Sequence, residues 1–438
     1  MGVFDQQVAA QLFDAAATLP WLQAQRGAAR AAWLGGKMPT RKTEAWKYTT
    51  LDALAELDYL PALPTGSPDI GQTGALIDGL EADRLVFVDG RYEPALSSLR
   101  AQPGVTVVRF AAADEAQRAL IASRFATLAH GGDNPFIALN GCWTTDGVLL
   151  HVAAGVKAER PLCVVHLGVA DSRPVAAAQR TLVVLEEQAQ AQLIEYFPSV
   201  TGCQNSLLTG ATEIALAASA QLEHCRLHLE EEHAIHIGGV YVDLGRTARY
   251  QGFVMGLGGR LKRLDLRIRH RGQGSECHTN GIYLARHAQH FDLHSTVEHE
   301  STHGTTAQVF RGIIDDAARA VFNGRIHIHP QAQKTCADLS NRNLLLSNEA
   351  EIDTKPELEI YADDVRCSHG ATVSRIDEKS LYYLQTRGIA RAEAERLLGF
   401  GFVNELLNPV TNTALQELLR RVVRGWFGRS ADPLGQLP

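Results

Sequence analysis

The sequence predicts a mostly β protein whose core is a right-handed parallel β-helix, with α-helical parts at both ends. The first observation is that residues 136–375 show almost no helical periodicity, only short apolar runs separated by Gly, Asn and Asp. The second is strict alternation in some of these runs, where Leu264, Leu266 and Ile268 alternate with polar residues, so we expect one face of such a strand to be buried and the other to be wet. More than 200 residues of β structure would strain a single sandwich, whereas a solenoid adds coils without enlarging its cross-section. No repeat of fixed length is visible.

Residues 1–135 are predicted to form a helical and mixed N-terminal domain. Val8, Leu12, Ala15 and Leu19 have helical spacing, which Pro20 interrupts, so two helices are expected before Leu34. A connector at residues 38–49 follows, in which basic residues are interleaved with Trp46 and Tyr48. We expect this connector to pack onto the body of the protein rather than to stack on single-stranded nucleic acid. Strands are expected at residues 85–88 and 105–108, and a helix at residues 114–128.

Residues 376–438 are predicted to form a C-terminal helical module. Asp377 can cap a helix that stops at Gly388, and a second helix is expected at residues 390–407. A third is expected to open with the capping box of Thr413 and Gln416 and to present one apolar stripe, formed by Leu415, Leu418, Val422 and Trp426. Gly399 and Gly401 lie within the second helix and predict either a break or a close neighbour.

Composition excludes several classes of function. The net charge of -7 gives no overall attraction to nucleic acid or to anionic membranes, and no apolar run is long enough to span a bilayer. The first residues carry no export signal, so a cytoplasmic protein is expected. The seven cysteines are scattered without a Cys-x-x-Cys pair, which argues against a disulfide framework and against a metal site built from one local motif.

Histidine and glycine motifs suggest metal-binding and nucleotide-binding sites, but each motif lacks a residue that such a site requires. Five histidines lie between residues 287 and 303, and a His-x-His pair at residues 327–329 resembles cupin metal sites. The Glu that a cupin needs next is replaced by Gln333 and Lys334, so polar ladders on an exposed strand face are the favoured interpretation. No complete phosphate-binding loop, dinucleotide fingerprint or serine elbow is present, so we expect no enzyme activity from this chain alone.

Cys367 and His369 are the remaining candidates. In an extended segment they project from the same face, near enough to share a metal or a sulfur species. Two ligands do not complete a site, so the pair is either structural or completed by another chain at the end of the β region.

Several segments together resemble the SufB/SufD family of iron–sulfur cluster assembly proteins, and within it the SufD type of subunit in the SufBCD complex. The segments are residues 39–49 (PTRKTEAWKYT), 341–347 (NRNLLLS), 353–360 (DTKPELEI), 367–372 (CSHGAT) and 383–389 (YLQTRGI). Their order and spacing match along most of the chain, most densely from Asn341 to Pro409.

The resemblance implies a non-enzymatic scaffold that pairs with SufB through the ends of the two β-helices. Its C-terminal helices would bind the SufC ATPase, which supplies the nucleotide chemistry. His369 would face a nascent cluster at the SufB interface, with Cys367 a less certain neighbour, and both are the metal-ligand candidates. No cofactor is expected in the isolated chain, which could form a homodimer, whereas a transient iron–sulfur cluster is expected in the complex. The alternatives are a SufB-like, cluster-carrying subunit and, from another class, a β-helix enzyme acting on polysaccharide.

Overall fold

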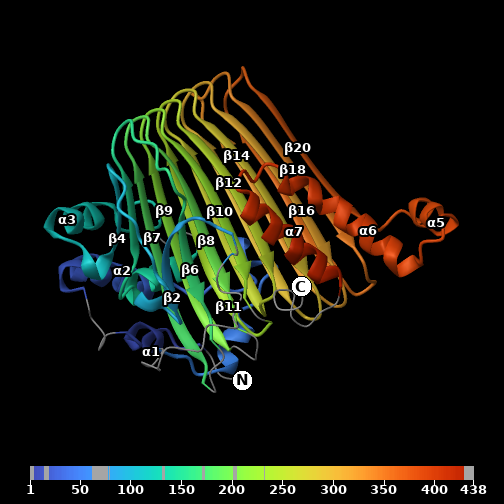
Figure 1. The fold of residues 1–438 in the computed structure, drawn as a ribbon, viewed down its shortest axis with the longest axis horizontal. Coiled ribbons are helices and arrows are strands. Elements are labelled where there is room, and N and C mark those ends of the chain that lie inside the picture. Colours follow the sequence, from blue (N-terminus) through green and yellow to red (C-terminus); the bar gives the residue numbers. More distant parts are fainter. Residues whose placement is uncertain are drawn as a thin grey trace.

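Two parallel sheets form the body of the protein. The computed structural model describes residues 4–13, 19–61, 77, 79–130, 134–169, 173–200, 205–230 and 232–428 (Figure 1). Successive strands alternate between the sheets, and each pairs in parallel with the strand two positions along the chain. This is the predicted parallel β-helix and not an antiparallel sandwich. Ala15 of the predicted first helix lies outside the described residues.

The first sheet contains β5 (Val148–Val152), β7 (Val175–Leu185), β9 (Ser206–Leu216), β11 (Ile235–Leu244), β13 (Leu261–His270), β15 (His290–His299), β17 (Arg319–Ile328) and β19 (Glu351–Ile360). The second contains β6 (Leu162–Leu167), β8 (Gln190–Pro198), β10 (Gln221–Leu229), β12 (Arg249–Leu257), β14 (Glu276–Ala285), β16 (Thr305–Ile314), β18 (Cys336–Leu345) and β20 (Arg366–Ser374). Four earlier strands extend these sheets: β1 (Leu60–Pro61), β2 (Asp83–Val88), β3 (Arg91–Tyr92) and β4 (Val105–Arg109). The domain boundary at residue 136 stays a prediction.

Most of the N-terminal part lies against the outer face of the first sheet, whereas β2 and β3 belong to the second sheet. Its helices are α1 (Gln6–Gln11), α2 (Gln23–Gly35), α3 (Glu115–Arg124) and α4 (Pro135–Trp143), with short 3-10 helices η2 (Pro20–Leu22), η3 (Glu44–Trp46), η4 (Asp52–Glu56), η6 (Pro94–Leu96) and η7 (Phe110–Ala112). Helix α4 falls within the region predicted to be free of helices. It is buried on nearly every side, so it has no polar face to reveal the helical period.

The connector packs on the body, as expected. Trp46 is buried, the Arg263 guanidinium lies 4.7 Å from its ring centre, and Arg263 donates a hydrogen bond to the carbonyl of Ala45. Thr49 donates to Asp292 at 2.5 Å. Because this cover reaches the outer face of β13, the outward Asp265 is buried beside the inward Leu264, and the prediction that one face of this strand is wet was wrong there.

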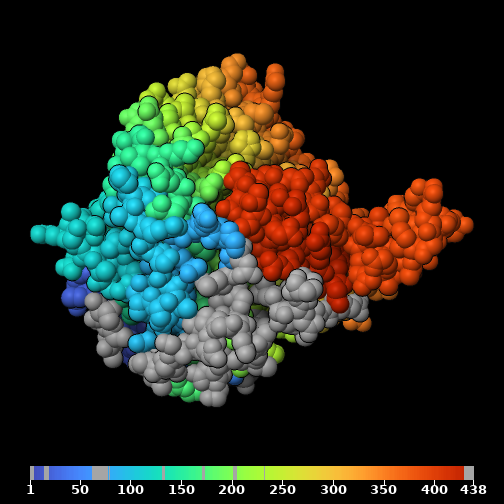
Figure 2. All heavy atoms as spheres, viewed as in Figure 1, coloured from blue at the N-terminus to red at the C-terminus, as the bar shows by residue number. Residues whose placement is uncertain are grey.

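The C-terminal module, residues 376–428, lies across the outer face of the second sheet and then projects beyond β20 (Figures 1 and 2). It consists of α5 (Glu378–Thr386), α6 (Arg391–Asn404), η8 (Glu405–Leu407) and α7 (Thr413–Phe427). The predicted apolar stripe of α7 is buried on the sheet, but Asn412, and not Thr413, caps the helix. Helix α6 continues through both glycines. A β-carbon on Gly399 would stand 2.6 Å from the Phe427 ring, whereas one on Gly401 would meet nothing within 4 Å, so the close-neighbour interpretation is confirmed at Gly399 only.

Candidate functional site

The last coil of the β-helix, β19 with β20, is called the end coil here. In the described chain each of its strands has a neighbour on one side only: β19 pairs with β17 and β20 pairs with β18. The outer edges therefore present backbone amides and carbonyls that a further strand can pair with.

Cys367 and His369 both project toward the inside of this end coil. Cys367 lies in register with Ala337 and His369 with Leu339, and both of these β18 side chains belong to the inner core. Cys367 is half-buried against that core, whereas His369 is exposed because no further coil of the described chain covers it. Burial raises the pKa of the Cys367 thiol, so the thiolate that would bind a metal is disfavoured there. Imidazole is the better-placed donor of the two.

Exposed apolar side chains lie on the same end coil as this pair. Ile360 is 41% exposed, Val373 48% and Tyr361 62%, and all three lie on or beside the end coil. Ion pairs flank them on the outer face, including Arg325 with Glu359 at 2.6 Å. An apolar centre with a polar rim has the composition of a protein interface.

The histidines between residues 287 and 303 do not form one site. His287 contacts Glu232 at 2.5 Å on the surface, and His294 contacts Asp292 at 3.1 Å. His299 departs from the predicted exposed ladder, since it is buried inside the β-helix and stacks on His270 with ring centres 4.1 Å apart. His327 and His329 lie 4.3 Å apart between ring centres, next to Tyr361.

The β-helix contains a buried charged cluster that was not predicted from the sequence. Glu195 accepts from Arg226 at 2.5 Å and contacts His224 at 3.0 Å, while Gln179 donates to the same carboxylate at 2.8 Å. Burial favours the protonated acid, but the Arg226 guanidinium and His224 outweigh it and hold the pKa of Glu195 well below its usual range. The alternation of His224, Arg226 and His228 along β10 was the available signal, and it reads equally well as an exposed face.

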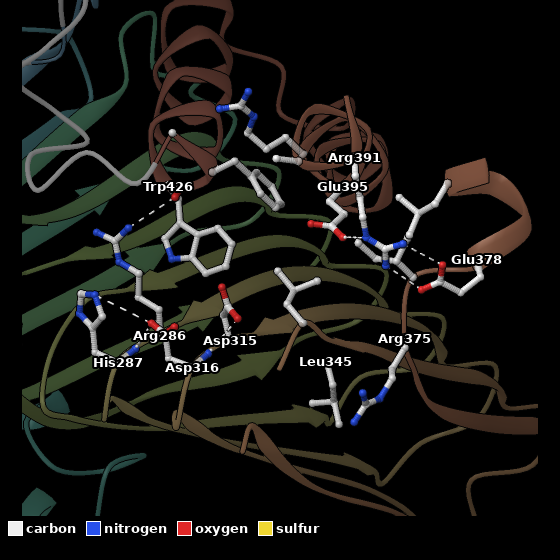
Figure 3. Close-up of a pocket in the computed structure, with 17 residues that line it drawn as sticks. Arg286, His287, Asp315, Asp316, Leu345, Arg375, Glu378, Arg391, Glu395 and Trp426 are labelled. Atoms are coloured by element: carbon white, nitrogen blue, oxygen red, sulfur yellow. Dashed lines mark hydrogen bonds and ion pairs between the residues drawn. The ribbon is translucent and has the colours of Figure 1, made fainter. Parts of the chain in front are cut away.

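A large cavity separates the C-terminal module from the flank of the β-helix (Figure 3). It has a volume of about 750 Å³, and its lining includes Leu345, Arg375 and Trp426. Arg391 of α6 forms an ion pair with Glu378 of α5 at 2.7 Å and another with Glu395 of its own helix at 2.9 Å. The first pair links α5 to α6 at the projecting end of the module.

Three large hydrophobic side chains of α5 and α6 are exposed among charged neighbours. Tyr382 is 70% exposed, and Tyr383 and Leu397 are exposed as well. None of the described helices is long and apolar enough to cross a membrane.

Comparison with known proteins matches two family models to this chain. Residues 5–164 match the SufBD protein N-terminal region, and residues 167–402 match the SufBD core domain of the SUF system for FeS cluster assembly. The chain is 34% identical to the iron–sulfur cluster assembly protein SufD of Escherichia coli over 415 residues, covering 94% of each chain. It is 30% identical to an iron–sulfur cluster assembly SufBD family protein of Synechocystis, covering 88% of this chain and 87% of that protein. The SufB protein of Bacillus subtilis is 26% identical over 276 residues, 62% of this chain and 58% of that protein.

Proposed function

Because this chain belongs to the SufBD family of iron–sulfur cluster assembly proteins, we propose that it acts as a SufD-type scaffold, which pairs with SufB, recruits SufC and has no catalytic site of its own. The observation that carries the proposal is the end coil, where Cys367 and His369 lie on an inner face that no further coil covers. Because the chain belongs to this family, we no longer propose the alternative function, a β-helix enzyme that acts on polysaccharide.

The end coil supports pairing with another β-helix. Its strand edges can accept further strands, and the exposed Ile360, Tyr361 and Val373 would lose water on contact. A homologous chain has the same cross-section, so the two inner cores could continue into each other. SufB is the proposed partner, and a second copy of this chain would occupy the same surface when SufB is absent.

His369 would then lie at the junction of the two chains. A neutral imidazole is a competent iron ligand, and the absence of nearby described thiolates other than Cys336 and Cys367 requires SufB to supply the rest of the site. The cluster is the cargo of this assembly and forms only in the complex.

SufC would bind the projecting face of α5 and α6. Tyr382 and Tyr383 of α5 and Leu397 of α6 are exposed, and exposed aromatic side chains are of the kind enriched at protein interfaces. The chain has no phosphate-binding loop, so ATP hydrolysis would belong to SufC.

The proposal is tested by co-expressing the tagged chain with SufB and SufC and weighing the purified complex by native mass spectrometry. We expect one complex that contains all three proteins and hydrolyses ATP, whereas the isolated chain does not. Recovery of the chain alone, with SufB and SufC untouched in the flow-through, would contradict it.

A further inference from the structure

Two imidazoles and one carboxylate converge inside the β-helix at the turn from β10 to β11. His228, Glu230 and His236 are all buried, and they are named the buried triad here. The two Nδ1 atoms lie 3.2 Å apart, and Glu230 Oε1 lies 2.6 Å from Nδ1 of His236 and 3.7 Å from Nδ1 of His228. Two ligands of a tetrahedral ion with bonds of about 2.1 Å lie about 3.4 Å apart. The three donor atoms already span nearly such a triangle.

We propose that the buried triad binds one divalent transition-metal cation, Zn²⁺ or Fe²⁺, through two imidazole nitrogens and one carboxylate oxygen. Two histidines and one carboxylate are an established donor set for both ions. The proposal goes beyond the scaffold function and does not depend on it, since the triad lies five strands from β20 in the same sheet, about 24 Å at about 4.8 Å for each strand.

The hydrogen bonds of the triad cannot all be satisfied by protons. Arg226 Nε is always protonated and donates to His228 Nε2 at 3.0 Å, so the neutral His228 ring carries its proton on Nδ1. His236 needs a proton on Nδ1 to donate to Glu230. Two N–H groups then face each other across 3.2 Å. If a cation occupied the triangle, each of these nitrogens would lose its proton and direct a lone pair at the cation, and the repulsion between the two N–H groups would be removed.

The proton balance of binding follows from these contacts. The His236 proton moves from Nδ1 to Nε2, and that ring stays neutral. His228 would release its Nδ1 proton to the solvent, and the ring would lie as an imidazolate between the cation and the Arg226 guanidinium. Lys262 keeps its contact with the other carboxylate oxygen of Glu230, Oε2, at 2.5 Å and leaves Oε1 to the ion.

An independent observation concerns the far side of the His236 ring. His236 Nε2 and Gln179 Oε1 are both buried, and neither has a hydrogen-bond partner among the described residues. They lie 2.8 and 3.0 Å from the point where a β-carbon on Gly210 would stand. Arg226 Nη2, which also lacks such a partner, lies 2.9 Å from that point, so all three atoms face the same small space. The Gln179 amide nitrogen is engaged by Glu195, which directs its oxygen there. A metal-bound histidine needs an acceptor at its second nitrogen, and Gln179 lies on that side.

Space for a further ligand lies next to the triad. A cavity of about 30 Å³ is lined by Glu230, by buried His166 and by half-buried Asp89, and a water molecule needs about half that volume. Both ring nitrogens of His166 lack hydrogen-bond partners among the described residues, so this cavity offers polar atoms as well as room. A water molecule held there would lie beside Glu230, and half-buried Asp89 lines the same cavity.

The test uses the full-length chain, stripped of metal and titrated with Zn²⁺, and with Fe²⁺ under anaerobic conditions, against a chromophoric chelator. We expect one ion for each chain. Co²⁺ in place of Zn²⁺ should give visible d–d bands without a thiolate charge-transfer band, and X-ray absorption should show nitrogen and oxygen ligands only. Glu230→Gln and His236→Gln should abolish this binding, Gln179→Leu should weaken it about 10–100-fold, and His299→Gln, another buried histidine, should not change it.

Sulfur ligands in the wild-type spectra would place the ion at the cysteines and overturn the assignment. So would a wild-type chain that binds neither ion, or a folded His236→Gln protein that binds as the wild type does. The spectra need only the wild-type protein, so they remain decisive where a variant does not fold. Cluster assembly in the complex with SufB is measured separately, and its result does not depend on whether the buried triad binds a metal ion.

Discussion

Leu339 and His369 occupy the same inward-facing register position on neighbouring strands, yet Leu339 is only 2% exposed whereas His369 is exposed. The difference is the presence or absence of one further coil. Each inner side chain of the β-helix is covered by the coil on either side of it, and β20 has only one such neighbour among the described strands. A partner that continued the β-helix would cover His369 as β20 covers Leu339.

The first prediction concerns His369 in the complex. His369→Ala should fold and assemble with SufB and SufC, because an exposed side chain contributes little packing, but should lower cluster yield at least about tenfold by removing a ligand. The yield is measured by visible absorption after anaerobic reconstitution with iron and sulfide. Cys367→Ala should be milder, since burial raises the pKa of that thiol and keeps it protonated. Normal yield from the His369→Ala complex would refute the role.

The second prediction concerns the end coil as an interface. Val373→Glu should leave thermal stability within about 0.5 kcal/mol of wild type, because the side chain is already 48% exposed. It should weaken SufB binding by about 2 kcal/mol, or about thirtyfold, because the new carboxylate would be buried without a partner. Titration calorimetry measures the affinity. Val8→Glu, at an exposed position on α1, is the matched control and should bind SufB normally.

The third prediction assigns SufC binding to the projecting helices. Tyr382→Ala combined with Leu397→Ala should reduce SufC capture at least about tenfold, since truncating interface anchors costs about 1–2 kcal/mol each. Leu99→Ala, another exposed apolar residue, should not. Deleting the whole module from residue 376, the obvious truncation, would uncover the sheet residues Ile282 and Leu344, which α7 covers, and would confuse lost docking with lost stability.

The course of the β-helix was predictable because its strands keep a two-residue period and its turns are short. Its repeat was not recognised from the sequence, although Gln188, Ser219 and Thr247 each adopt a positive φ and each precede a buried alanine. These turns are 31 and then 28 residues apart, so no fixed period reveals them. The structure shows the recurring unit as a turn with a small inward residue.

The buried triad was not predictable because β10 reverses the usual pattern. His228 points inward, whereas Leu227 and Leu229 point outward and are buried under the C-terminal module. Alternation shows which residues share a face, but it does not show which face is inside when a later segment covers the outer one. For Cys367 and His369 the shared face was predictable, because both lie on one strand.

The fourth prediction is loss of stability in mild acid. Burial lowers the pKa of His299 to about 4 and that of His166 to about 3, below the about 6.5 of an unfolded chain. Between about pH 6.5 and about pH 4 the unfolded chain binds more protons, so the free energy of unfolding falls as pH falls. The His299 difference is about 3 kcal/mol over that window. Urea unfolding at a series of pH values should show a shallower dependence for His299→Gln and an unchanged one for the exposed His287→Gln.

The last prediction concerns the attachment of the connector, residues 38–49, to the first sheet. Arg263 is buried between Asp292 at 2.5 Å and Asp265 at 3.1 Å, and its guanidinium supports the Trp46 ring. Although burial raises it, the pKa of Asp292 is held well below its usual range by Arg263. Arg263→Met keeps an unbranched, flexible stem but leaves two buried carboxylates without their cation.

We expect Arg263→Met to lower the free energy of unfolding by about 3–5 kcal/mol and to expose the connector to limited proteolysis near Lys47. Adding Asp292→Asn should recover part of that loss, because an amide costs less to bury than an unpaired carboxylate. Lys355→Met is the matched control, since it removes the exposed ion pair of Lys355 with Glu44 of the same connector at 2.9 Å. That pair should contribute less than about 1 kcal/mol, so proteolysis of the Lys355→Met protein should match wild type. Equal losses in the two variants would show that charge at the surface, and not the buried pairing of Arg263, holds the connector in place.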